Sequence, residues 1–410
     1  MITVESNLAT KSLAAPPAWL ATVRNRGLIV GLIFAVLSAI GAFTNFQTFM
    51  HGYLMGYMFC LSLCLGGMAL VMLGHMTGGN WFMMGRRIME AQQRTLPLLA
   101  VMFIPVAVFM KELYVWANPS QVLANDAVMH WKMERWLNPH GFVIRAVIYF
   151  LIWGLWIWKL NAGSREQDTN PDPVVWQRLK AWSAPGILVY GFTLTFASVD
   201  WVMSMDGHWF STIYGMIYMA QHALVTFAFA IVMLILLTPV SVIGEVMFKD
   251  RLHDFGKLIF ALTMVWGYFS FSQFLIIWSG NLPEEISWFL ARMTGGWGPI
   301  ALLLVVGQFA LPFVLLLFRD IKRDARKLIL VALLVIVVRW FDTFWLVVPN
   351  PWPGNPTATT HFTFSWMYVA VPVAMAGIWF AYFAMELAKR PLLVRNDPQL
   401  PRLWEHSHGH

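Results

Sequence analysis

Charged residues are scarce in this chain. Only 12% of the 410 residues are charged, whereas 59% are hydrophobic. A soluble protein of this length needs far more charged surface to cover its core, so the composition excludes an ordinary soluble domain. The net charge of +7 does not indicate a nucleic-acid groove, because the basic residues stand in short runs between apolar stretches, where they act as topology signals.

Cysteine is almost absent as well. Cys60 and Cys64 lie one helical turn apart inside an apolar stretch. An iron–sulfur or zinc site needs about four ligands, and no Cys-x-x-Cys-His sequence is present to attach a c-type haem. We therefore expect two small hydrophobic side chains in a buried helix face, no metal site and no covalently bound cofactor. The C-terminal His406, His408 and His410 predict a solvated tail rather than a metal site.

Long apolar runs dominate the rest of the sequence. A run of about 20 such residues is long enough to cross the ~30 Å hydrocarbon core as a helix. The stretch before Gly27 is polar and contains proline, so it does not resemble a cleaved signal peptide. We expect an all-α integral membrane protein with a tail at 1–26, a ten-helix membrane domain at 27–388 and a second tail at 389–410. The ten expected spans are 27–47, 53–75, 96–116, 141–161, 183–203, 211–237, 255–279, 297–318, 328–348 and 364–388.

The distribution of lysine and arginine predicts the orientation of these spans. Of the 28 basic residues, 22 fall in the two tails and the even-numbered loops or their edges, four on the opposite side and two within spans. The positive-inside rule then places both termini in the cytoplasm, and we expect the bacterial cytoplasmic membrane. The longest opposite loop, about 117–140, contains Trp131 and Trp136, which indicate a small surface helix or a docking patch for a partner.

Polar side chains line one face of the fifth span and one face of the sixth. At 100° per residue, Tyr190, Thr193, Asp200 and Ser204 fall in a narrow stripe. The sixth span carries a second stripe, which consists of Ser211, Tyr214, Tyr218, His222 and Thr226. Tyrosine, histidine and threonine side chains can each donate and accept a hydrogen bond, so this ladder predicts a proton relay.

Further ionisable residues lie near both membrane surfaces and within the ninth span. Such groups are costly in hydrocarbon and each needs a partner or a function. Together they suggest two proton half-channels that approach each other from opposite sides. The proton-route candidates are His75, Asp200, Asp206, His208, Tyr214, Tyr218, His222, His253, Asp254, Lys257, Arg339 and Asp342.

Structural interpretations of these residues stay open beside the functional one. Arg339 and Asp342, three residues apart, can form an ion pair that packs helices. His222 can be a hydrogen-bonded contact between helices. Asp206 and His208 can simply shape the turn between the fifth and sixth spans.

The segment Ala197–Gly215, ASVDWVMSMDGHWFSTIYG, resembles a signature of the second NrfD-like membrane subunit of bacterial alternative complex III. That complex is a quinol:cytochrome c (or high-potential acceptor) oxidoreductase of the respiratory chain. The resemblance covers essentially residues 27–388. Shorter matches are His75-x-Thr-Gly-Gly-x-Trp81 with Arg86-Arg87, Lys111-Glu112-Leu-Tyr114-x-Trp116, and Arg339-x-x-Asp342.

The resemblance implies a polysulfide-reductase-like fold, in which helices two to five and six to nine form two four-helix bundles and the first and last helices flank them. It implies a complex with a first NrfD-like subunit, an iron–sulfur subunit, multihaem and mono-haem cytochromes and a possible terminal oxidase, within lipid. A chain of this kind has no haem or metal of its own. It can border a quinone or quinol, for which Asp200, His222 and Arg339 are the candidates, or conduct protons.

Two other functions remain open at this point. A purely structural scaffold would support the quinol-oxidising paralogue without chemistry of its own, so the chain is not by itself identified as an enzyme. A secondary transporter would show broken helices at the midplane, and Pro105 and Pro312 each fall well inside an expected span. A di-haem cytochrome b is disfavoured, because it needs four intramembrane histidines, whereas the sequence offers His222 at depth and His75 at an edge.

Overall fold

The computed structural model describes residues 17, 19–122, 124–354, 361–400 and 403. Ten of its helices are long and apolar enough to cross a membrane, which confirms the expected number of spans. No strand occurs in the part of the chain that the structure describes. The protein is therefore an all-α, multi-pass membrane protein. Lys11 and the three C-terminal histidines lie outside the described residues.

The spans follow one another as single long helices, except that the third, fifth and eighth are composite. The fifth, Pro173–Met205, joins α9 to η3. The third span, Asn80–Val108, joins α4 to α5, and the eighth joins α14, the π-helix η5 and α15. The spans are α2 (Trp19–Thr44), α3 (Phe46–Thr77), α4 (Asn80–Gln93) with α5 (Leu96–Val108), α8 (Pro139–Thr169), α9 (Pro173–Trp201), α10 (Tyr214–Leu237), α12 (Lys249–Gly280), α14 (Gly298–Leu304) with η5 (Val305–Ala310) and α15 (Leu311–Leu317), α17 (Ala325–Val347) and α18 (Met367–Ala388).

Short helices occupy the connections. They are α6 (Met110–Leu113), η1 (Val115–Ala117), η2 (Pro119–Gln121), α7 (Ala127–Arg135), η3 (Met203–Met205), η4 (Thr238–Val240), α11 (Ile243–Val246), α13 (Pro283–Met293) and α16 (Arg319–Arg323). The helix expected in the 117–140 loop is thus present as α7. The structure also corrects two boundaries: α2 begins at Trp19, within the expected tail, and α4 lies in the expected loop before the third span.

Local sequence explains where several spans begin. The side chain of Asn45 accepts a hydrogen bond from the Thr48 N–H and caps α3. Asn138 and Asp172 cap α8 and α9 in the same way, and each is followed by a proline at the first helical position. These caps satisfy backbone donors that have no partner inside the helix, and proline has no N–H to lose there.

The long helices form two closed four-helix rings. In the first bundle, α3, α5, α8 and α9 pack around one another; in the second bundle, α10, α12, α15 with its neighbours, and α17 do so. The bundles meet where α10 packs on α3 and α9, and α18 packs on both α2 and α3. Two bundles with two flanking helices are the architecture that the family resemblance implied.

The close contact between the bundles depends on a glycine. A Cβ added at Gly66 of α3 would lie 2.3 Å from the His222 carbonyl oxygen of α10 and 2.1 Å from the Thr226 hydroxyl. That hydroxyl donates a hydrogen bond to the Ser62 carbonyl oxygen at 3.0 Å. Thr226, expected in the proton ladder, therefore takes part in the contact between α3 and α10.

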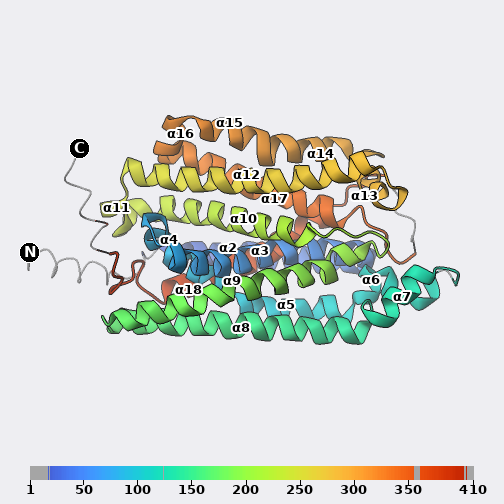
Figure 1. Ribbon diagram of the computed structural model, residues 1–410, viewed down its shortest axis with the longest axis horizontal. Coiled ribbons are helices and arrows are strands. Elements are labelled where there is room, and N and C mark those ends of the chain that lie inside the picture. Colours follow the sequence, from blue (N-terminus) through green and yellow to red (C-terminus); the bar gives the residue numbers. More distant parts are fainter. Residues whose placement is uncertain (1–16, 18, 123, 355–360, 401–402, 404–410) are drawn as a thin grey trace, which may run out of the picture.

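Different short helices cover the two ends of the molecule. Figure 1 shows α4, α11 and α16 at one end, which we call the basic end, and α7 and α13 at the opposite end, which we call the far end. The expected tail at 389–410 is packed in its described part. Gln399 accepts a hydrogen bond from the Gly79 N–H at 3.0 Å, and the Leu403 carbonyl accepts one from Arg251 of α12 at 2.5 Å. The described residues 389–400 and 403, which we call the C-terminal strap, thus contact both bundles.

Candidate functional site

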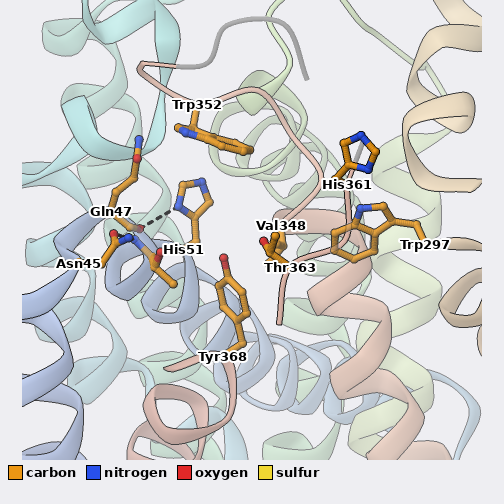
Figure 2. A pocket seen from close by; sticks show the side chains of 10 residues that line it. Asn45, Gln47, His51, Trp297, Val348, Trp352, His361, Thr363 and Tyr368 are labelled. Atoms are coloured by element: carbon orange, nitrogen blue, oxygen red, sulfur yellow. Dashed lines mark hydrogen bonds between the residues drawn. The ribbon is translucent and has the colours of Figure 1, made fainter. Parts of the chain in front are cut away.

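The described part of the chain contains a cavity of about 300 Å³ at the far end. It lies between the start of α3, the end of α17 and the start of α18 (Figure 2). Its lining contains no aspartate, glutamate, lysine or arginine, so it suits an uncharged ligand that forms hydrogen bonds. The lining residues are Asn45, Gln47, Thr48, His51, Trp297, Val348, Trp352, His361, Thr363 and Tyr368.

His51 is the most distinctive group in this cavity. Its Nδ1–H donates to the Gln47 carbonyl oxygen at 2.8 Å, which leaves the lone pair on Nε2. Nε2 is buried and has no partner among the described residues. In Figure 2 the imidazole lies between the rings of Trp352 and Tyr368. His51 therefore lines the cavity and carries, between aromatic rings, a ring nitrogen with no partner among the described residues.

The sequence did not single out His51. A lone histidine inside an apolar run has no spacing that distinguishes a ligand-binding side chain from a structural one. The other walls of the cavity come from residues roughly 250–320 positions further along the chain. None of the three predicted quinone candidates lines it: Asp200, His222 and Arg339 all lie elsewhere.

The interior of the second bundle is polar. Arg339 and Asp342 of α17 form the expected ion pair, and both side chains are buried. Gln221 of α10 donates a hydrogen bond to the same carboxylate oxygen at 2.7 Å. The Arg339 guanidinium also lies 5.9 Å from the centre of the Tyr218 ring. The pair therefore connects α17 to α10, as well as one turn of α17 to the next.

Many polar atoms of this interior have no partner among the described residues. Buried polar groups are normally hydrogen-bonded, and polar cavities in proteins hold ordered water that supplies the missing bonds. The unpartnered atoms are the Tyr218 hydroxyl, Gln221 Oε1, both ring nitrogens of His222, both side-chain amide atoms of Gln308, and Nε and Nη2 of Arg339. They come from α10, η5 and α17, which all belong to the second bundle.

The π-helix η5 carries Gln308 into this bundle. Pro312 has no N–H to donate to the Gln308 carbonyl, which removes one bond of the α-helical pattern. π-turns inside membrane helices often coincide with functional positions. The helix continues through α15, and Pro105 likewise lies inside α5. Neither proline breaks its span at the midplane in the manner that the transporter interpretation expects.

The predicted ladder on α10 is present in part. The rings of Tyr214 and Tyr218 lie 5.1 Å apart, and those of Tyr218 and His222 lie 5.9 Å apart. The three side chains are buried on one face and lead from the far end towards the middle of the second bundle. Thr226 departs from the ladder, because its hydroxyl bonds to α3.

On the side of the basic end, His75 is the nearest comparable group. It is buried at the end of α3, and its Nδ1 lies 3.0 Å from the Ser183 hydroxyl oxygen. That hydroxyl donates to the Leu179 carbonyl, so Nδ1 is the donor and Nε2 the free acceptor. His253, Asp254 and Lys257 lie on the first turns of α12; the last two form a 3.2 Å ion pair between exposed side chains. This trio lies at the surface, apart from the ladder.

Asp200 is held by a saturated set of donors at the far end of the first bundle. Arg145 donates from Nε at 2.8 Å and from Nη2 at 2.9 Å. The Trp136 indole donates at 2.8 Å and the Tyr149 hydroxyl at 2.9 Å. This carboxylate ties α9 to α8 and to the residue after α7, and its bonding capacity is filled. Its geometry is that of a structural clamp.

The remaining signature residues shape the far-end surface. The Asp206 carboxylate accepts the backbone N–H groups of His208 and Trp209, both at 3.3 Å. The exposed His208 side chain bonds to Asp126, the N-cap of α7, at 2.6 Å. Burial opposes ionisation of Asp126, but the bonds from the Met129 N–H and His208 outweigh it and lower its pKa. These residues fasten the loop between α9 and α10 to α7.

A tryptophan stack closes the second bundle at the same end. The Trp209 ring lies 4.4 Å from that of Trp288 on α13, nearly parallel to it. Arg292 places its guanidinium 3.6 Å from the Trp288 ring centre and donates to the Trp345 and Leu346 carbonyl oxygens at 3.2 Å. Burial lowers the pKa of Arg292 to about 9. The cation therefore binds the carboxyl end of α17, where helix carbonyls concentrate negative potential.

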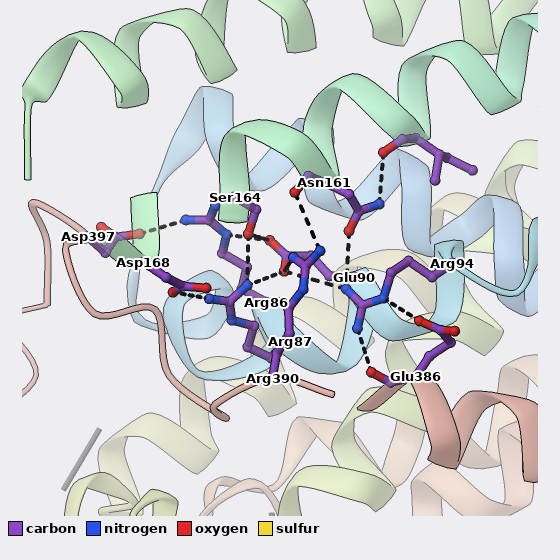
Figure 3. Close-up of polar contacts among 11 residues, drawn as sticks. Arg86, Arg87, Glu90, Arg94, Asn161, Ser164, Asp168, Glu386, Arg390 and Asp397 are labelled. Atoms are coloured by element: carbon purple, nitrogen blue, oxygen red, sulfur yellow. Dashed lines mark hydrogen bonds and ion pairs between the residues drawn. The ribbon is translucent and has the colours of Figure 1, made fainter. Parts of the chain in front are cut away.

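A dense charge cluster holds the basic end together (Figure 3). Glu90, 1% exposed, accepts hydrogen bonds from Arg86 and Arg87, both at 2.8 Å, and from Ser164 at 2.7 Å. Arg390 of the C-terminal strap lies 3.8 Å from the same carboxylate. The other ion pairs of the cluster are Arg86–Asp397, Arg87–Asp168, Arg94–Glu90 and Arg94–Glu386.

The sequence suggested only the arginines of this cluster, as topology signals. The spacing of Arg86, Glu90 and Arg94 is the i, i+4 pattern of a charged helix face, and it could have indicated α4. The cluster connects α4, α8 and α18 to the strap, so its evident role is structural.

Comparison with known protein families finds no family that matches this chain, and no curated protein matches it either. Within the described residues, no group of three or more histidine, cysteine, aspartate or glutamate side chains is placed to hold a metal ion. The described residues define a multi-pass, all-α membrane protein with a neutral cavity at the far end and a polar interior in the second bundle.

Proposed function

We propose that this chain is a membrane subunit of a quinol:cytochrome c (or high-potential acceptor) oxidoreductase, in the bacterial cytoplasmic membrane with both termini cytoplasmic. The basic end would then face the cytoplasm and the far end the periplasm, in keeping with the excess of Lys and Arg at the basic end. The Ala197–Gly215 segment supports the assignment by its resemblance to a subunit of such complexes. Its partners would be the paralogous NrfD-like subunit, the iron–sulfur subunit and the cytochromes.

The contribution of this subunit to the complex would be a proton route through the second bundle. The observation that carries this proposal is the cluster of buried, unpartnered polar atoms on α10, η5 and α17. Water held by those atoms would link His222 to Arg339 and Asp342, and Tyr218 and Tyr214 would extend the chain to the far end. Each tyrosine passes a proton on by donating its own while it accepts another.

The far-end cavity favours a second role, the binding of a quinol ring. Its neutral lining, two tryptophan walls and free His51 acceptor fit a flat ring with hydroxyl groups. A bound quinol would supply two electrons and two protons to the complex. His51 would orient one hydroxyl through Nε2, while the Gln47 carbonyl fixes the tautomer that leaves Nε2 free.

The test is a pair of substitutions in the assembled complex. We expect His222→Ala and Asp342→Asn to lower proton release per electron several-fold in complexes reconstituted into vesicles, at normal subunit content. The matched control is His140→Ala, at an exposed position at the start of α8. If both variants keep full turnover and full proton release, the proton route is wrong. A scaffold would instead show reduced yield of the complex with unchanged turnover per assembled copy.

A further inference from the structure

One outward face of α12 carries a polar side chain near the middle of the membrane. Tyr268 is 68% exposed, and at 1.5 Å per residue it lies about 5 Å from the midpoint of α12. With a hydrocarbon core ~30 Å thick, the nearer surface is about 10 Å away along the helix. The phenol hydroxyl makes no hydrogen bond to the described residues. Thr44 and Ser279, two other exposed polar side chains of the described spans, lie near helix ends.

Contact with lipid alone is unfavourable for the Tyr268 hydroxyl. Acyl chains offer no hydrogen-bond partner, and a hydroxyl without one is unfavourable in an apolar medium. Tyrosine hydroxyls that leave water normally find a partner. Because the side chain projects sideways from the middle of the span, the hydroxyl cannot reach the head groups.

The face around Tyr268 combines small and large side chains. The small residues Ala261, Ser272 and Ser279 and the larger, exposed Met264 and Leu275 all fall within about 40° of Tyr268 around the helix axis. Small residues that allow close approach, together with a polar group that bonds across, characterise contacts between membrane helices. The outward face of α8 differs, because its exposed positions in mid-span include Val147, Ile148, Leu151 and Leu155. These apolar side chains indicate a face that contacts lipid.

We propose that this face of α12 packs against a transmembrane helix of a different membrane subunit, which presents a hydrogen-bond acceptor opposite the Tyr268 hydroxyl. The inference rests on the proposed function in one respect, namely that the chain is part of a complex with other membrane subunits. It adds which surface of the chain makes the contact and what the contacting helix must carry.

A second copy of this chain fits the face poorly. Copies in one membrane share the same orientation, so a two-fold axis between them would run along the membrane normal and set each residue opposite itself. Tyr268 would then meet Tyr268, and small Ser272 would meet Ser272. A tight contact instead needs the tyrosine to face small residues and the serine to receive a larger one. The second copy is therefore an outcome for the test rather than the proposal.

The experiment places a photoreactive benzophenone amino acid at position 268 of the full chain in its native complex. The matched control carries it at Leu151 of α8, which is 67% exposed. We expect position 268 to form an adduct with a membrane helix of another subunit, and mass spectrometry to locate the adduct beside a residue with a hydrogen-bond acceptor. Position 151 should label lipid. Adducts of position 268 with lipid alone, or between two copies of the chain, overturn the proposal.

A second variant separates the hydrogen bond from the packing. Tyr268→Phe removes only the hydroxyl, and an average hydrogen bond between membrane helices changes affinity about threefold. We expect a loss of that size in retention of the partner subunit as detergent is raised, and no change for Phe192→Leu on the outward face of α9. Equal retention of the partner in both variants contradicts the assigned bond. If the adduct forms although His222→Ala leaves proton release intact, the contact stands and the proton route fails.

Discussion

Glu90 should be the least replaceable carboxylate of the basic end. Substitution by glutamine preserves its shape and removes its charge. Arg86, Arg87 and Arg94 each also pair with a second carboxylate, which the substitution leaves in place. Among the described residues, Arg390 has Glu90 as its one acidic partner within 4.0 Å. The variant therefore leaves about one cation without its counter-charge.

The size of the effect follows from that count. Removing one partner from a buried ion pair costs about 3–5 kcal/mol. With an unfolding entropy of roughly 2.1 cal/mol/K per residue, a chain of 410 residues should lose about 4–6 °C in Tm. The matched control is Glu166→Gln, which breaks an ion pair with Arg178 whose two side chains are 41% and 47% exposed. Exposed pairs contribute at most about 1 kcal/mol, so the control should shift Tm by about 1 °C or less.

Unfolding can be followed through the two cysteines. Cys60 and Cys64 are both buried, so a thiol-reactive dye reports their exposure as the detergent-solubilised chain unfolds. We expect the dye to label the cysteines of Glu90→Gln at a temperature several degrees lower than in the control variant and the unaltered protein. If Glu90→Gln and Glu166→Gln unfold together, within about a degree of the unaltered chain, the charge cluster does not hold the basic end as we describe.

Three further outcomes follow from the structure. Gly66→Ala should destabilise the chain by about 1–3 kcal/mol in the same dye assay, because its Cβ would overlap α10, whereas Gly154→Ala, with open space around it, should not. Asp200→Asn should cost about 2–4 kcal/mol by leaving a mostly buried arginine without its carboxylate, again read from Tm; an unchanged Tm contradicts the clamp. The lowered pKa of Asp126 means that its contribution is present above pH 3.8 and lost as the pH falls further. The protection of α7 amides, corrected for their intrinsic exchange rates, should therefore fall as the pH drops below 3.8 by more than it does in Asp126→Asn, in which His208 already lacks its partner.

The sequence predicted the features that depend on local spacing. Ten apolar runs of sufficient length became ten spans, and Arg339 and Asp342, three residues apart on one helix, formed the expected pair. Tyr214, Tyr218 and His222 share a face because 100° per residue is a property of the helix alone.

Features that need distant parts of the chain could not be predicted in this way. Helix α4 was assigned to a loop because Arg86, Arg87 and Glu90 lower its hydropathy, yet these charges are buried by Asp168 and by the strap. The cavity at His51 exists because residues near 300, 350 and 365 fold over the start of α3. Neither arrangement leaves a periodic trace in the sequence.

The proposed function places this chain inside a quinol-oxidising complex. It is tested most directly by purifying the chain from native membranes through an affinity tag and assaying the product for quinol-dependent reduction of bound haem. We expect the chain to co-purify with haem-containing and iron–sulfur subunits and the assembly to oxidise quinol. Isolation of the chain alone, or with partners that hold no redox centre, would contradict it.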